Sequence, residues 1–382
     1  MIYKLSDICE YVNGKVDISK LDFCTFISTE NMLSNKAGII ESSALPNIKQ
    51  TQIYRAGDVL VSNIRPYFKK IWYATYDGGC SNDVLVFRAK NGVSKRFLYY
   101  VLADDNFFSY SMLNSKGTKM PRGDKKAIME YKVPKFSYEE QVKIAKILGD
   151  LDDKVAVNKA INRNLSEQAQ AYFDELFIQN ASVEWKEGTL SDVGSIVAGG
   201  TPSKSNQEYY TDNGIAWITP KDLSVDKSAF ISHGENDITE LGLQKSSATM
   251  MPAGTVLFSS RAPIGYIAIA ANEICTNQGF KSVVPNDNVG TSYVYYLLKQ
   301  LLPTIENMAS GSTFKEISGS AMKIVPTVIP DDETLKRFSD FCDPIMKQIQ
   351  KNEQESKRLV ELRDTLLPKL MSGELDVSDL KI

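Results

Sequence analysis

Polar loops at equivalent places in the two halves of the chain carry the residues best suited to chemistry. In the second half these loops span 199–204, 217–223, 257–265, 275–281 and 310–317. They combine Arg, Lys, Asn and Gln with Gly, Ser and Thr. Arg and Lys suit guanine or phosphate, and Asn and Gln can bind adenine through two hydrogen bonds. Gly, Ser, Thr and Asn also form ordinary turns, but recurrence of these loops in both halves favours the reading of a nucleic-acid groove.

Motifs for catalysis are missing at the level of sequence. There is no Gly-rich phosphate loop ending in Gly-Lys-Ser/Thr and no GxGxxG after a strand. The single histidine, His233, leaves almost no room for Ser-His-Asp or Cys-His catalysis. Pro330-Asp331 and Glu355-Ser356-Lys357 resemble the string of a magnesium nuclease, but the second part falls inside a helical pattern. We therefore expect no catalytic residue, no metal and no cofactor.

Composition indicates an ordinary globular protein. The 382 residues are 43% hydrophobic and 24% charged, which suffices for two cores. Five scattered cysteines and one histidine offer no zinc site, and unpaired thiols suit a reducing compartment. The sequence shows no signal-peptide pattern and no apolar run long enough for a membrane span. We expect a cytoplasmic protein with no membrane association.

The elements that must position the loops occur twice. Ala56-Gly57-Asp58-Val59-Leu60 returns as Ala253-Gly254-Thr255-Val256-Leu257, and Cys80-Ser81-Asn82-Asp83 returns as Cys275-Thr276-Asn277-Gln278. A near-constant offset of about 190–200 residues indicates the tandem duplication of a whole domain with its helix. Stretches 58–61 and 83–87 predict strands, 95–108 predicts a helix, and 131–134 predicts a further strand.

A long helical pattern follows each copy. Ser137 and Glu140 form a capping-box signature. Apolar positions then alternate spacings of four and three from Ile144 to Leu176, as in a coiled coil. The second helix shows a similar seam from Phe338 to Leu370 and ends at Gly373. Asn158 and Asn352 occupy matching mid-seam positions, where a buried Asn fixes register, so we expect the helices to pair antiparallel.

Charge is unevenly distributed between the copies. Residues 1–136 contain 20 Lys and Arg against 13 Asp and Glu, a net charge of +7. Residues 183–330 contain 10 against 14, a net charge of −4. Phosphate binding calls for cations, so only limited surfaces of such a chain are expected to face nucleic acid.

The second half resembles the specificity subunit of type I restriction–modification systems. The resemblance is carried by GGTPSKSN (199–206), WITPKDL (217–223), GTVLFSSRAPIGYIAIA (254–270), CTNQGFKS (275–282), SGSTFKEIS (310–318) and LLPKLMSGELDV (366–377). The first half shows a weaker form of the pattern in ISTENM (27–32), VSNIRPYFKKI (61–71) and CSNDVLVF (80–87). It departs from the pattern at Asn13-Gly14-Lys15, and Arg65 is shifted by one position relative to Arg261.

The resemblance implies an α/β (α+β) architecture of two tandem target-recognition domains joined by two long antiparallel coiled-coil helices in a pseudo-twofold repeat. The implied boundaries are 1–136 and 183–330 for the recognition domains, with helical spacers at 137–182 and 331–382. Each recognition domain would read one half of a bipartite double-stranded DNA site. The helices would set the spacer between the half-sites and dock two methyltransferase (modification) subunits, with Asp152, Asp153 and Glu361 as docking candidates. Catalysis would lie in partners, and a restriction (translocase/nuclease) subunit is a further partner that the sequence leaves open.

Residues expected to face DNA follow from these loops. In the second copy they are Lys204, Lys221, Arg261, Asn277, Gln278, Lys281 and Lys315. In the first copy they are Asn31, Asn63, Arg65, Tyr67, Lys69, Lys70, Asn82, Lys116, Lys119 and Arg122. Tyr67 could stack on a base displaced from the duplex.

Two other functional classes remain open at this point. A nuclease or methylase with an unrecognised site would turn over DNA with magnesium or S-adenosylmethionine. A stand-alone coiled-coil adaptor would bind protein partners without salt-dependent DNA affinity. The recurring loops argue against the adaptor, and the missing motifs argue against the enzyme.

Overall fold

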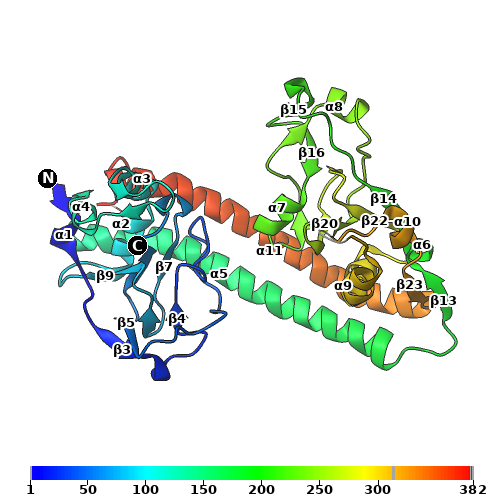
Figure 1. The fold of residues 1–382 in the computed structure, drawn as a ribbon, viewed down its shortest axis with the longest axis horizontal. Helices are drawn as coiled ribbons and strands as arrows, with labels where there is room; N and C mark the ends of the chain where they lie inside the picture. The colour runs from blue at the N-terminus through cyan, green and yellow to red at the C-terminus, as the bar shows by residue number, and fades with distance from the viewer. Residues whose placement is uncertain (1, 312–314, 379, 381–382) are drawn as a thin grey trace. The chain divides into compact units, whose positions relative to one another are not determined.

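Two compact units make up the chain. The computed structural model describes residues 2–311, 315–378 and 380. The first unit combines residues 1–156 with 357–382, and the second unit spans 157–356 (Figure 1). Both contain helices and strands, which confirms the α+β class predicted from the sequence. Every helix among the described residues is too short or too polar to cross a membrane.

The first unit is built mainly on two four-stranded sheets. They have the strand orders β2-β9-β6-β7 and β3-β5-β8-β4, beside the pairs β1-β12 and β10-β11. The strands are β1 (Ile2–Lys4), β2 (Cys9–Tyr11), β3 (Lys15–Asp17), β4 (Phe26–Ile27), β5 (Gln50–Tyr54), β6 (Val59–Ser62), β7 (Ile71–Tyr73), β8 (Gly78–Cys80), β9 (Val84–Ala89), β10 (Ser115–Lys116), β11 (Arg122–Gly123) and β12 (Lys132–Pro134). The short helices are α1 (Leu5–Ile8), η1 (Ile18–Lys20), η2 (Pro66–Phe68), α2 (Lys95–Ala103), α3 (Asp105–Leu113) and α4 (Lys125–Ile128).

The second unit repeats this plan with additions. Its sheets have the orders β14-β22-β19-β20-β17 and β15-β18-β16-β21, beside the pair β13-β23. The strands are β13 (Lys186–Thr189), β14 (Gly194–Ala198), β15 (Tyr210–Thr211), β16 (Ile215–Ile218), β17 (Phe230–Ile231), β18 (Asp237–Ile238), β19 (Val256–Ser260), β20 (Ile264–Ala270), β21 (Cys275–Thr276), β22 (Lys281–Pro285) and β23 (Pro326–Ile329). The short helices are α6 (Leu190–Val193), η4 (Gln207–Tyr209), α7 (Pro220–Val225), α8 (Glu240–Gln244), α9 (Thr291–Met308) and α10 (Gly319–Lys323).

The repeat extends to strand pairing. In the first unit β4 pairs in parallel with β8, so that Ile27 lies beside Cys80. In the second unit β16 pairs in parallel with β21, so that Trp217 lies beside Cys275. The two cysteines of the repeated Cys-Ser/Thr-Asn motif therefore take equivalent places in the two folds, as the duplication predicts.

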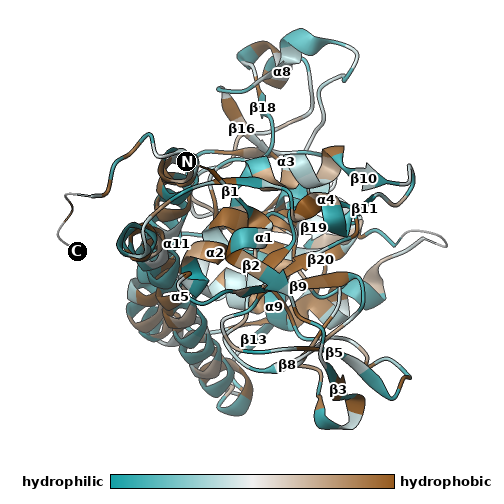
Figure 2. Ribbon diagram, turned by 90° about the vertical axis from the view of Figure 1, so that its left-hand side faces the viewer, coloured by the Kyte–Doolittle hydropathy of each residue, from teal (hydrophilic) through white to brown (hydrophobic). Residues whose placement is uncertain are grey.

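Two long helices contribute to both units. They are α5 (Tyr138–Asp174), which continues as a π-helical turn at Glu175–Gln179, and α11 (Asp332–Ser372). The capping box is confirmed, because the Ser137 amide donates to Glu140 and the Glu140 amide donates to the Ser137 hydroxyl. Gly373 ends α11 at a φ of 77°, as expected of a C-cap. Figure 2 shows that both helices are largely hydrophilic with hydrophobic residues interspersed, whereas the sheet strands are largely hydrophobic.

The helices run antiparallel within each unit. In the second unit, Tyr172 stacks on Phe338 and Asn352 donates to Asn162. In the first unit, Asp152 binds Arg363, and Lys143 donates to the Ser378 carbonyl just beyond α11. Residue numbers thus rise along α5 as they fall along α11, as predicted. The seam predicted for α11 between Phe338 and Leu370 included Phe341 and Leu362, and for these two the prediction is wrong, because they are 43% and 46% exposed.

A further correction concerns the helix expected over 95–108. It is divided into α2 and α3 at Asp104, which adopts an extended conformation. The Asp104 carboxylate accepts a hydrogen bond from the Asn106 amide and so caps α3. An Asp that satisfies free amides at a helix start is favoured over one in a helix interior. The strand predictions agree with β6, β9 and β12.

Candidate nucleic-acid interface

An open cavity of about 660 Å³ lies in the second unit. Five residues selected from the sequence line it, and we name it the Arg261 cavity. They are Lys204, Lys221, Arg261, Asn277 and Gln278. The fold therefore brings side chains from four separate loops to one concave surface. Their chemistry combines cations with carboxamides, which is the combination that reads base edges and phosphates.

Parallel pairing of β16 with β21 explains why two of these loops meet. Ile218 lies beside Thr276 at the ends of the paired strands. The chain then leaves the same sheet edge twice, once into α7 with Lys221 and once into Asn277. The Asn277 amide donates to the Ile218 carbonyl at 2.9 Å, which fixes the second exit against the first.

The glycine pair preceding Thr201 permits close packing beside the cavity. A Cβ at Gly199 would lie 2.0 Å from the carbonyl oxygen of Asn277, and one at Gly200 would lie 2.2 Å from the Ala248 nitrogen. The Gly200 carbonyl also accepts a hydrogen bond from the Trp217 indole at 2.9 Å. Any side chain at these two positions would displace backbone, so the Gly-Gly sequence is a steric requirement of this wall.

Acidic partners hold three of the cations in the second unit. The Glu316 carboxylate lies 3.3 Å from the Arg261 guanidinium and 3.8 Å from the Lys281 ammonium. Glu235, on the cavity lining, binds Lys221. Burial lowers the pKa of Lys281, while Glu316 opposes that shift by raising it. The sequence analysis selected neither acid, because Glu235 and Glu316 are each far along the chain from the cation they bind.

The two carboxamides of the cavity are oriented by the protein. The Asn277 side-chain oxygen accepts a hydrogen bond from the Gly279 amide at 2.8 Å. The Gln278 side-chain oxygen accepts one from the Thr201 hydroxyl. Since the oxygens are engaged, the amide nitrogens remain as donors, and no acceptor for them is present among the described protein groups. Such donors suit the N7 and O6 acceptors of a purine.

Two further residues selected in the second copy lie outside the lining of the cavity. The Lys281 side chain is only 11% exposed and begins β22. Lys315 is exposed. Positions 312–314 of the SGSTFKEIS motif lie outside the described residues.

In the first unit, the selected turn around Tyr67 is backbone-strained. Arg65 and Lys69 flank η2 with φ angles of 51° and 50°, a left-handed conformation that is costly for residues with a Cβ. Tyr67, between them, is 48% exposed and lies against Phe68 at 4.7 Å between ring centroids. The turn thus presents an aromatic ring and two cations together.

A second loop reinforces this turn and adds a cation that sequence reasoning missed. The Asn35 and Lys36 amides donate to the Phe68 and Lys69 carbonyls at 2.8 and 2.9 Å. Asp105 then binds Lys36 and Lys69, both at 2.8 Å. Lys36 has no counterpart among the repeated motifs, and only its turn-forming neighbours mark it in the sequence.

Three residues selected in the first copy are buried or bonded within the protein itself. Asn31 is 3% exposed, and its amide nitrogen donates to the Phe26 and Ile40 carbonyls. Lys70 donates to the Thr29 carbonyl at 2.6 Å, and burial lowers its pKa. Asn63 is 9% exposed, and its buried side-chain oxygen has no hydrogen-bond partner among the described residues. Asn31 and Lys70 therefore hold their own loops in shape.

The β10–β11 hairpin brings Arg122 beside Arg65. Arg122 forms a bridge with Ile64, and the Arg65 amide donates to the Pro121 carbonyl at 2.8 Å. Arg122 pairs with Asp83 at 3.0 Å, and Lys116 pairs with Asp124 at 2.7 Å. Lys119 and Asn82 are exposed. The selected cations Arg65, Lys69, Lys116, Lys119 and Arg122 thus lie on one turn and one hairpin.

The two asparagines selected for helix register lie in one polar layer. The side-chain amide nitrogen of Asn158 donates to the Glu355 carboxylate at 2.8 Å. The side-chain amide nitrogen of Asn352 donates to the side-chain oxygen of Asn162 at 2.7 Å. Asn158 and Asn352 are 1% and 5% exposed. An axial shift of one helix along the other would break these hydrogen bonds between buried side chains.

The acidic docking candidates are used partly within the first unit. Asp152 binds Arg363 and accepts a hydrogen bond from the Tyr100 hydroxyl, both at 2.7 Å. Asp153 binds Arg96 at 2.7 Å. Glu361 is exposed. Of the three, only Glu361 makes no ion pair among the described residues.

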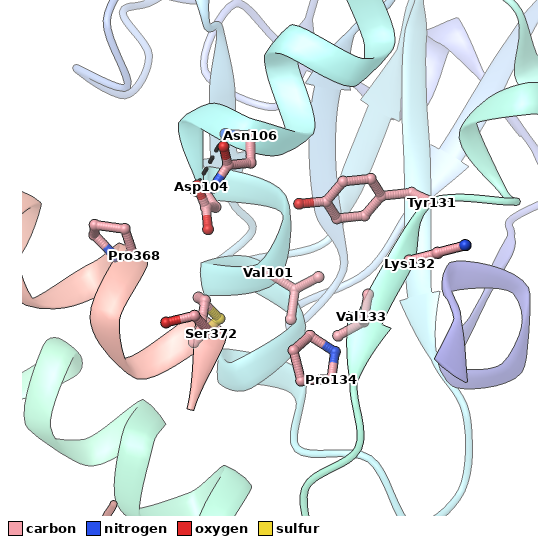
Figure 3. A pocket seen from close by; sticks show the side chains of 10 residues that line it. Val101, Asp104, Asn106, Tyr131, Lys132, Val133, Pro134, Pro368 and Ser372 are labelled. Atoms are coloured by element: carbon pink, nitrogen blue, oxygen red, sulfur yellow. Dashed lines mark hydrogen bonds between the residues drawn. The ribbon is translucent and has the colours of Figure 1, made fainter. Parts of the chain in front are cut away.

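A cavity of about 260 Å³ in the first unit contains none of the residues selected for DNA. Figure 3 shows Tyr131 and Val101 facing it, with Pro368 on the opposite wall and Asp104 above. Its lining is mainly apolar. It therefore offers no set of convergent cations or carboxamides comparable to the Arg261 cavity.

Comparison with known proteins gives one consistent result. Residues 1–167 and 182–361 match the family described as the type I restriction modification DNA specificity domain. The MjaIX specificity subunit of Methanocaldococcus jannaschii is 39% identical over 50% of this chain, although the match spans only 45% of that protein. The HindI specificity subunit of Haemophilus influenzae is 25% identical over 98% of this chain and 99% of its own length. The crystal structure of a type I restriction–modification S subunit from M. genitalium shares the fold with a TM-score of 0.60 at 16% identity, covering 97% of this chain and 96% of that one.

Proposed function

Because the chain belongs to the type I restriction modification DNA specificity family, we propose that it is the DNA-binding specificity subunit of such a complex. It is non-catalytic, and each of its two recognition domains reads one half of a bipartite site. We assign the recognition domains to residues 1–136 and 183–330, and the helical spacers to 137–182 and 331–382.

The Arg261 cavity is the observation that carries this proposal. It gathers Lys204, Lys221, Arg261, Asn277 and Gln278 on one concave surface. Arg reads guanine through two hydrogen bonds, and oriented carboxamides read purines. Lysines on the same surface supply the phosphate contacts that hold a duplex in place.

The first recognition domain uses a different set of groups for its half-site. Arg65, Tyr67, Lys69 and Arg122 come together there, with Lys36 added by the structure, while Asn82, Lys116 and Lys119 surround them. Asn31 and Lys70 shape the loops, while Asn63 is buried. Because the two domains present different side chains, the two half-sites differ in sequence.

The long helices set the distance between the half-sites and dock two methyltransferase subunits. Cleavage and methyl transfer belong to partner subunits, including a restriction subunit where the system cleaves DNA. Such a complex acts on genomic DNA, so we propose that the chain works in the cytoplasm. The free thiols of all five cysteines agree with that reducing compartment.

Replacing Arg261 tests base reading directly. We expect Arg261→Ala to weaken binding to the specific duplex by about 1–3 kcal/mol while leaving a duplex with the second half-site scrambled nearly unaffected. Gel-shift titration of the purified full chain on both duplexes measures this.

The matched control is Arg358→Ala, which removes the same charge from an exposed position of α11. It should change the affinity for either duplex only slightly, because Arg358 does not line the Arg261 cavity. A uniform loss on both duplexes for Arg261→Ala would assign that residue to phosphate. No effect on either would remove the Arg261 cavity from the interface.

A further inference from the structure

The arginines at related positions in the two recognition domains differ in their electrostatic surroundings. Arg261 lies beside the Glu316 carboxylate at 3.3 Å. Arg65 has no carboxylate within ion-pair distance among the described residues, and its buried Nε has no hydrogen-bond partner there. The second domain therefore contains an acidic group that the first domain lacks at this place.

Backbone pairing fixes Glu316 beside the cavity. Its amide donates to the Ser310 carbonyl at 2.9 Å, and its carbonyl accepts from the Ser310 amide at 3.1 Å. Glu316 also forms an isolated bridge with Arg261. The next residue, Ile317, is fully buried and donates its amide to the Ser260 carbonyl. The carboxylate is therefore placed by the fold.

The position of the carboxylate has a direct electrostatic consequence. One negative charge stands beside two positive charges, those of Arg261 and Lys281. A phosphate that approaches this pair meets attraction from the cations and repulsion from Glu316. The edge of a guanine is neutral and accepts hydrogen bonds without that repulsion. Glu316 therefore penalises phosphate contacts at Arg261 more than base contacts.

We propose that Glu316 is a specificity-determining residue of the second recognition domain. It holds Arg261 in position and suppresses binding of Arg261 and Lys281 to phosphates of non-specific DNA. This role rests on the proposed DNA-binding function. It concerns only the half-site that the second domain reads.

The test is Glu316→Gln in the full chain, titrated on three duplexes. One carries the complete site, one has the second half-site scrambled, and one has the first half-site scrambled. We expect affinity for the duplex with the scrambled second half-site to rise by about three- to tenfold and its salt dependence to steepen, since one repulsive charge is lost. Affinity for the complete site should stay within about twofold. Equal changes on the complete and second-scrambled duplexes, or no change, would overturn the proposal.

Two further variants separate a local role from a general change in charge. Glu235→Gln removes a carboxylate from the exposed Lys221 pair on the same cavity. It should raise affinity for all three duplexes alike and leave their ratios unchanged. In an Arg261→Ala background, Glu316→Gln should lose most of its effect on discrimination, because the two residues act together. A full effect in that background would contradict action through Arg261.

Failure of the proposed function gives a different result. If the wild-type chain binds the complete and scrambled duplexes equally, the chain does not read this DNA. If the wild type discriminates and Glu316→Gln discriminates equally well, only the role of Glu316 is lost.

Discussion

Single residues of the second recognition domain are constrained by backbone as well as by chemistry. Gly200 is the clearest case, since the Ala248 nitrogen and the Ser247 carbonyl carbon lie 2.2 and 2.3 Å from the place of a Cβ. Both neighbours are backbone atoms that belong to another loop. The Gly-Gly sequence is therefore explained by packing, whereas Arg261 is explained by what it can bind.

We expect Gly200→Ala to reduce the free energy of unfolding by about 1–3 kcal/mol, because an added methyl group must displace backbone. Urea unfolding monitored by the tryptophans measures this, since Trp217 donates to the Gly200 carbonyl. Gly319→Ala is the matched control, because its Cβ would meet only Lys281 at 3.7 Å. Equal stability of the two variants would show that the wall near Gly200 adapts.

The residues of the site could be predicted from sequence only in part. Five residues chosen for their type do line one cavity, and two of the loops that carry them leave a shared sheet edge. Glu316 and Lys36 could not be found, since their partners are distant in sequence and depend on tertiary contacts. Asn31 illustrates the converse, because a good groove-reading residue is equally good at closing its own loop.

At the level of elements, one helix closes the edge of a sheet. β17 lies at the edge of the five-stranded sheet of the second unit. The Glu353 carboxylate of α11 accepts hydrogen bonds from the Ala229 amide at 2.8 Å and the Phe230 amide at 3.1 Å. A recognition-domain strand is thereby tied to a spacer helix through two charge-assisted hydrogen bonds.

We expect Glu353→Ala to speed amide hydrogen exchange at Ala229 and Phe230 by about ten- to a hundredfold, because hydrogen bonds to a charged group contribute about 1.5–3 kcal/mol. Exchange measured by mass spectrometry on peptides covering 226–233 detects the change. Glu361→Ala, at an exposed position of the same helix, should leave these peptides unchanged. Unaltered exchange in the Glu353 variant would mean that β17 is held by β20 alone.

The long helices were the most predictable elements. Ser137 with Glu140, the apolar spacing and Gly373 are local signals, and local signals need no knowledge of the rest of the fold. The break at Asp104 was not predicted, because the aromatic pattern continues across it. The exposure of Phe341 and Leu362 was also not predicted, because the spacing of apolar residues does not show which positions of a helix are covered by neighbouring elements.

At the scale of the molecule, the properties that matter for DNA binding are the net charge of each recognition domain and the spacing that the helices set. The first domain carries +7 and the second −4 by sequence. Long-range attraction to DNA therefore comes mainly from the first domain. In the second domain, Glu235 and Glu316 neutralise the cations with which they pair. Discrimination between DNA sequences there depends on short-range contacts.

Lengthening both helices tests their role in spacing. We expect insertion of four residues after Lys159 in α5 and after Lys351 in α11 to add about 6 Å to each helix. At about 3.4 Å per base pair, the preferred spacer should grow by one or two base pairs while both half-sequences stay the same. Methylome sequencing of cells that express the variant with its partner subunits measures site and spacer together. An insertion in one helix alone should abolish modification, and a changed half-sequence would contradict the spacing role.

The hydrophobic core of the first unit determines the order in which the two units are completed during synthesis. Leu367, Leu370 and Val377 pack in the same hydrophobic cluster as Leu5 and Leu148. The ribosome therefore completes the whole second unit, residues 157–356, before it releases the last parts of the first. At about 5–20 residues per second, the amino-terminal segment waits on the order of ten seconds or more for those leucines. The half of the protein that is made first is the half that finishes folding last.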